Sequence, residues 1–93
     1  MTTLEKAIET YGKDMQLNVA VEELSELIKE ICKNKRGADN REAIIEEMAD
    51  CYIMLHQLAL IFGIERPELD KTINFKIARL AKKLKEGSKD GRA

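Results

Sequence analysis

Two pairs of acidic residues at helical spacing are the part of this sequence best suited to chemistry. Glu23 and Glu26 form the first pair, and Glu47 and Asp50 form the second. Residues three apart project from one side of a helix, so each pair presents two carboxylates together. Like charges at this spacing destabilise a helix, and a bound cation relieves the repulsion. Two such pairs on neighbouring helices indicate an oxygen-rich site for Mg²⁺, with Mn²⁺ as the alternative ion.

The competing interpretation is that both pairs lie on solvated helix faces and pair with lysines such as Lys29. The repetition of the pair and the surroundings of the second pair weaken that interpretation. On a helical wheel the second pair shares its side with three apolar residues: Met54, Leu58 and Ile61. Carboxylates on such a face must be paired, protonated or bound to a cation. Three neighbouring glutamates are candidates for a further ligand or a general base: Glu22, Glu30 and Glu46.

Apolar periodicity and cap signals predict four helices and no strands. The expected ranges are 4–11, 14–34, 39 or 40 to 62, and 67–86. Thr2 with Glu5 fits a capping box for the first helix, and Asp39 with Glu42 is a second candidate. Glycines 12 and 63 mark the ends of the first and third helices. The fold class is therefore all-α.

The expected helix 14–34 carries one apolar stripe: Leu17, Ala20, Val21, Leu24, Leu27, Ile28 and Ile31. The expected third helix carries a wider apolar face: Ile44, Ile45, Met48, Ala49, Tyr52, Leu55, Ala59 and Phe62. Its other sides are also rich in apolar residues. A helix that is apolar nearly all round is usually buried on more than one side. This predicts a central helix or a partner subunit.

The composition fits one globular helical domain. The chain has 93 residues, of which 44% are hydrophobic and 35% charged. Cys32 and Cys51 form no metal or redox motif and are interpreted as small buried thiols in a reducing compartment. The chain shows no signal peptide and no apolar run of about 18 residues, so a cytoplasmic location without membrane contact is expected. His56 is interpreted as a hydrogen-bonded core residue, and no Glu-x-x-His pair supports a di-iron bundle.

Charge is distributed unevenly along the chain. The formal net charge is −1, yet residues 71–93 contain eight basic and two acidic side chains. Basic residues are favoured near the C-terminus of a helix, which is the simpler explanation, and phosphate binding is the alternative. With an acidic remainder and few aromatic residues, the chain is not expected to bind nucleic acid.

The ordered motifs resemble the all-α nucleotide pyrophosphohydrolases of the MazG-like family. The matching segments are Glu22-Glu23-Leu24-Ser25-Glu26-Leu27, then a basic turn, then Glu46-Glu47-Met48-Ala49-Asp50. They fit that family's ExxE and ExxD signature. The segment Asn74-Phe75-Lys76-Ile77-Ala78-Arg79-Leu80 supplies basic residues on the following helix, and Tyr11-Gly12 with Gln16 fits the entry to the first long helix.

The resemblance implies a four-helix MazG-like bundle over residues 1–86, with a flexible tail over 87–93, completed by dimerisation or tetramerisation. It implies that Glu23, Glu26, Glu47 and Asp50 hold Mg²⁺ and catalyse hydrolysis of a nucleoside triphosphate to the monophosphate and pyrophosphate. Lys76 and Arg79 would contact substrate phosphates, with Gln16 and Lys83 as weaker substrate contacts. The short chain has no obvious insertion that would form a base-selective lid.

Two alternatives stay open at this point. Within the same superfamily, the chain could act as a phosphoribosyl-ATP pyrophosphohydrolase. From another class, it could be a non-catalytic helical oligomer or a protein-interaction module that uses the same apolar stripes. The acidic quartet separates these possibilities, because a structural bundle tolerates Glu47→Gln whereas a metal-dependent enzyme does not.

Overall fold

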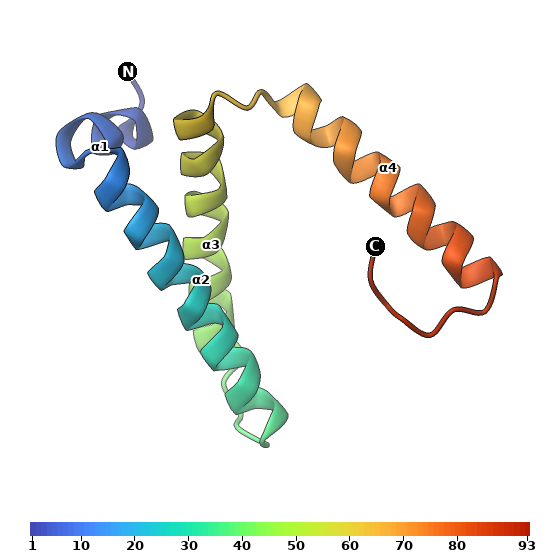
Figure 1. Cartoon of the computed structure of the whole chain (residues 1–93). Coiled ribbons are helices and arrows are strands. Elements are labelled where there is room, and N and C mark those ends of the chain that lie inside the picture. Colours follow the sequence, from blue (N-terminus) through green and yellow to red (C-terminus); the bar gives the residue numbers. More distant parts are fainter. The chain divides into compact units, whose positions relative to one another are not determined.

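The structure, a computed structural model, describes all 93 residues, and its regular secondary structure is all helix, as predicted. Its elements are α1 (Thr3–Tyr11), α2 (Lys13–Lys35), α3 (Arg41–Phe62) and α4 (Arg66–Lys85) (Figure 1). The predicted helix ends agree with these bounds to within one or two residues. The chain forms two compact units, Met1–Gly63 and Ile64–Ala93. The four-helix bundle expected from the family resemblance stays a prediction.

The helix ends are set by local chemistry, with one departure from expectation. The capping box at α1 is confirmed: Thr2 Oγ1 accepts a hydrogen bond from the Glu5 backbone, and Glu5 Oε1 accepts one from the Thr2 backbone. Gly63 ends α3 in the left-handed conformation, at φ 64°. The second predicted capping box, Asp39 with Glu42, is wrong. Asn40 precedes α3 but its side chain does not cap the helix. Its Oδ1 instead accepts a hydrogen bond from Asn34 Nδ2, and its Nδ2 donates to Glu30 on α2.

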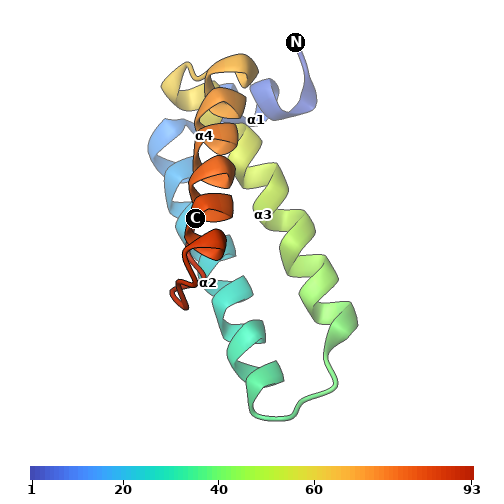
Figure 2. The same cartoon turned by 90° about the vertical axis from the view of Figure 1, so that its right-hand side faces the viewer.

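In the first unit, α2 and α3 are antiparallel neighbours, and α1 packs against both (Figures 1 and 2). The side chains buried or half-buried between the two long helices recur every three or four residues. We call them the seam. The seam residues on α2 are Gln16, Ala20, Glu23, Leu27 and Glu30. Those on α3 are Glu47, Asp50, Cys51, Met54, Gln57, Leu58 and Ile61. The predicted grouping of the second acidic pair with apolar residues of α3 is therefore confirmed.

The most apolar sides of both helices face outward in the single chain. On α2 the exposed residues are Val21, Leu24, Ile28 and Ile31. On α3 they are Ile45, Met48, Tyr52, Leu55 and Phe62. Both sets lie roughly 60–180° around their helices from the middle of the seam, in the same rotational sense. Because the helices are antiparallel, this rotation places both sets on the same side of the pair. They form one surface, the outer apolar face, and Glu22, Glu26 and Glu46 lie on the opposite side.

Two single-residue predictions fail for the same geometric reason. Cys51 is buried as expected, but Cys32 is exposed. His56 is exposed as well, and it makes no hydrogen bond, so it is not a core residue. At 3.6 residues per turn, positions 32 and 56 both point away from the neighbouring helix. Neither side chain is therefore enclosed between the helices of the first unit.

The second unit consists of α4 and the residues that follow it. Pro67 lies in the first turn, where its missing N–H costs nothing, as predicted. Lys82, Lys83 and Lys85 lie in the last turn, where the helix dipole favours cations. Residues 88–93 have no regular secondary structure. No single helix of the chain has both the length and the apolar composition needed to cross a membrane; only α3 and α4 taken together meet that criterion.

Candidate metal centre

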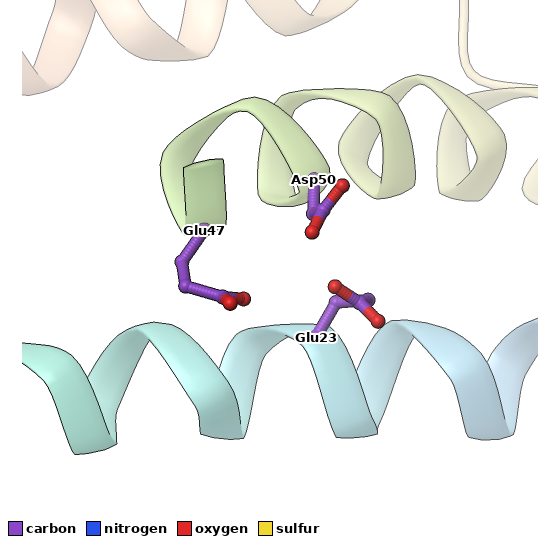
Figure 3. Close-up of side chains that lie close together, drawn as sticks. All are labelled: Glu23, Glu47 and Asp50. Carbon is purple, nitrogen blue, oxygen red and sulfur yellow. The ribbon is translucent and has the colours of Figure 1, made fainter. Parts of the chain in front are cut away.

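Three of the four predicted carboxylates converge between α2 and α3. Glu23 projects from α2, and Glu47 and Asp50 project toward it from α3 (Figure 3). Each offers one carboxylate oxygen, and the three oxygens lie within 4.8 Å of one another. All three side chains are half-buried. The i, i+3 spacing on α3 directs two carboxylates into the seam, and the antiparallel packing brings the third from the other helix. We call this set the carboxylate cluster.

The electrostatics of the cluster disfavour its full ionisation. The pKa of Glu23 is raised by a side-chain hydrogen bond with Asp50, then by burial and by the neighbouring negative charges. Burial raises the pKa of Glu47, and the charge of Asp50 adds to the effect. No lysine or arginine forms an ion pair with any member of the cluster. The negative charge is therefore uncompensated by the protein.

One oxygen of the cluster has no partner of any kind. Glu47 Oε2 is buried and accepts no hydrogen bond. A buried carboxylate oxygen without a donor is costly, and native structures rarely leave one unpaired. Hard divalent cations such as Mg²⁺ and Mn²⁺ take carboxylate oxygens as ligands and keep water in their remaining positions. The donor set and the orphaned oxygen both fit such an ion.

Glu26, the fourth predicted ligand, lies beside the cluster and not in it. Its Oε2 is 3.9 Å from Lys29 Nζ, and its side chain is 49% exposed. The reason is helical geometry. Glu23 points toward α3, and Glu26 is rotated about 60° away from it around the α2 axis. Its charge still raises the pKa values of Glu23 and Glu47. Direct metal ligation by Glu26 stays a prediction.

The neighbouring glutamates have different environments. Glu30 is buried, accepts a hydrogen bond from Asn40 and forms an ion pair with Lys33, at 3.2 Å. The hydrogen bond from Asn40 and the charge of Lys33 lower the pKa of Glu30. Glu30 therefore anchors the turn between α2 and α3, with its charge compensated. Glu22 and Glu46 are exposed.

A buried glutamine pair is the feature that sequence reasoning missed. Gln16 was expected to be a weak substrate contact, which stays a prediction, and its side chain is only 7% exposed in the single chain. Its Oε1 accepts a hydrogen bond of 2.7 Å from Nε2 of Gln57, which is 3% exposed. Gln16 lies seven residues before Glu23, and Gln57 lies seven residues after Asp50. That heptad spacing is the signal that would have placed both in the seam.

The predicted phosphate-binding residues lie on α4, in the second unit. Lys76 and Arg79 are one helical turn apart on that helix. Lys83 Nζ lies 4.0 Å from Asp90 Oδ2 and donates a hydrogen bond to the backbone oxygen of Arg92. Contact of Lys76 and Arg79 with substrate stays a prediction.

Comparisons with protein-family models, with curated proteins and with solved structures found no match for this chain. The resemblance to the MazG-like family therefore stays a prediction, which is based on the spacing of the motifs.

Proposed function

We propose that this chain is a Mg²⁺-dependent pyrophosphohydrolase of the MazG-like type, which hydrolyses a nucleoside triphosphate to the monophosphate and pyrophosphate. The observation that carries the proposal is the carboxylate cluster, with three oxygens within 4.8 Å and no cationic side chain to neutralise them. Clearance of noncanonical or surplus nucleotides is the role that this activity would serve.

The roles of the residues follow from their environments. Glu23, Glu47 and Asp50 would hold the ion, and the orphaned Oε2 of Glu47 supports this assignment. When bound, Mg²⁺ would neutralise triphosphate charge and lower the pKa of water near the α-phosphorus. Glu26 is more exposed and is a suitable acceptor for the proton of the attacking water. The water oxygen forms a bond to the α-phosphorus, the bond to the bridging oxygen breaks, and pyrophosphate leaves.

Phosphate recognition and self-association complete the proposal. Lys76 and Arg79 would bind the phosphates by charge-assisted hydrogen bonds. A homodimer or homotetramer is supported by the outer apolar face, whose residues include Ile28 at 61% and Tyr52 at 70% exposure. An apolar surface of this kind is typical of a subunit interface.

The test is pyrophosphate release from a panel of canonical and modified nucleoside triphosphates, with Mg²⁺, with Mn²⁺ or with EDTA. Glu47→Gln is the test variant, because it keeps the shape and removes the charge at the cluster. Glu42→Gln is the matched control, because this glutamate is exposed on the same helix and lies outside the cluster. We expect release that requires the metal, survives Glu42→Gln and falls at least a hundredfold in Glu47→Gln.

The opposite result is equally clear. If no triphosphate is hydrolysed and Glu47→Gln is equally or more stable than the parent, the triphosphate proposal is wrong. Phosphoribosyl-ATP is then the next substrate to test. Failure with that substrate as well would leave the non-catalytic helical oligomer, which the outer apolar face supports independently of the cluster.

A further inference from the structure

The buried pair Gln16–Gln57 has no role in the mechanism above, although it is one of the most enclosed features of the first unit. Its hydrogen bond is short, at 2.7 Å, and joins α2 directly to α3. The pair is not fully satisfied, because Gln57 Oε1 is buried without a partner. Two leucines would fill similar space without an orphaned acceptor. Packing alone therefore does not explain glutamine at these positions.

The position of the pair relative to the carboxylate cluster is regular. The pair lies one heptad, about 10 Å along the helix axes, from the layer of Glu23 and Asp50. One heptad beyond Glu23 in the other direction, Glu30 accepts the hydrogen bond from Asn40. The cluster is thus bracketed by two polar connections between α2 and the α3 side. The turn between the helices holds one end, and the glutamine pair joins the helices at the other end, where α1 also packs against both.

The end of the helix pair away from the turn has a reason to need such a connection. The seam is more polar than the outer apolar face, so hydrophobic burial alone favours other rotations and registers of α2 against α3. Mutual repulsion within the metal-free cluster favours separation of the helices as well. A hydrogen bond between two buried amides is directional, whereas leucine packing allows sliding. In coiled coils, a single buried polar layer fixes register at a cost in stability.

We propose that Gln16 and Gln57 are positioning residues that fix the register of α2 against α3 at which Glu23 faces Glu47 and Asp50. This inference rests on the proposed metal-binding function of the cluster. Neither glutamine belongs to the carboxylate cluster. Their effect on metal affinity is exerted through the alignment of the two helices.

The test variant is Gln16→Leu combined with Gln57→Leu, because the double replacement leaves no single amide buried without its partner. Met54→Leu is the matched control, a conservative apolar exchange at a buried position of the same seam. The first readout is the affinity for Mn²⁺ alone, measured by electron paramagnetic resonance.

The second readout does not depend on metal. Spin labels at the exposed positions Glu22→Cys and Glu46→Cys report the distance between α2 and α3. The background is Cys32→Ser and Cys51→Ser, since a serine hydroxyl keeps a donor to the Glu23 backbone oxygen, and the labelled protein is diluted with unlabelled protein. We expect the double leucine variant to keep its thermal midpoint, to broaden the distance distribution and to bind Mn²⁺ at least tenfold more weakly. Met54→Leu should change neither readout by more than a factor of two.

Two results overturn the inference: a distance distribution as narrow as that of the parent, or a broadened one with unchanged Mn²⁺ affinity. If the double leucine variant does not fold, Gln16→Met with Gln57→Met repeats the test with side chains of closer length. If the parent itself binds no Mn²⁺, the proposed function fails, and the metal-free distances still decide whether the pair fixes the register.

Discussion

Replacing Ile28 by glutamine should weaken self-association of the chain without weakening the fold of a single copy. Ile28 lies within the α2 part of the outer apolar face and is 61% exposed. Full burial of such a side chain contributes about 1.5–3 kcal/mol, so covering the exposed part contributes about 1–2 kcal/mol per copy. A two-fold interface contains two copies, which gives about 2–4 kcal/mol. The dimer dissociation constant should therefore rise roughly 30- to 700-fold.

The assay is sedimentation velocity over a range of protein concentrations, with the dissociation constant as the result. Glutamine has at least as favourable a helix propensity as isoleucine, so the helix content of the variant should be unchanged by circular dichroism. Met15→Gln is the matched control, because Met15 is 54% exposed on α2 but lies on the other side of that helix.

The reasoning is refuted if Ile28→Gln associates as tightly as the parent, within threefold, while both are folded. The outer apolar face of α2 would then not be the surface that a second copy covers. Equal weakening by Met15→Gln would refute it in another way, since the effect would not be specific to that face.

Two further predictions concern stability. The pKa values of Glu23 and Glu47 are raised above 4.5 in the folded state, so the metal-free folded chain binds more protons than the unfolded chain above that pH. The free energy of unfolding from urea titrations should therefore fall as pH rises from 4.5 through the raised pKa values. Saturating Mg²⁺ should make this fall smaller. A free energy that does not fall with pH, or a fall that saturating Mg²⁺ does not reduce, would contradict the cluster. Thr2→Ala removes the side-chain cap of α1 and should cost about 1 kcal/mol, measured by thermal unfolding. Thr3→Ala, just inside the helix, is the control and should change stability little.

Sequence reasoning succeeded where the signal is local. The capping box at Thr2 and the stop at Gly63 involve only residues within one turn, and both appear in the structure. The partial burial of Glu47 and Asp50 was also predictable, because their positions on the helical wheel coincide with those of apolar neighbours on the same helix.

The errors arose where a side chain's environment depends on the neighbouring helix. A helix that is apolar nearly all round, such as α3, does not by itself specify which side meets its partner. The widest apolar face was expected to be covered by a central position in the fold or by a partner subunit. In the single chain Tyr52 within it is 70% exposed, so its burial by a partner stays a prediction. Gln16 was misjudged for the same reason, because its burial depends on Gln57, which lies 41 residues away in the sequence.

The polar seam and the outer apolar face have a common physical explanation. A chain of this size buries only about 60–70% of its unfolded surface, so its one seam between long helices is a large share of the interior available to it. Here much of that seam is occupied by Gln16, Gln57 and the carboxylate cluster. The apolar residues that would normally fill such a seam are consequently on the outside of the pair. Metal binding would remove the repulsion within the seam, and association would bury the displaced apolar surface. A single metal-free copy should therefore be the least stable form of the chain, and added Mg²⁺ and higher protein concentration should each raise its thermal midpoint.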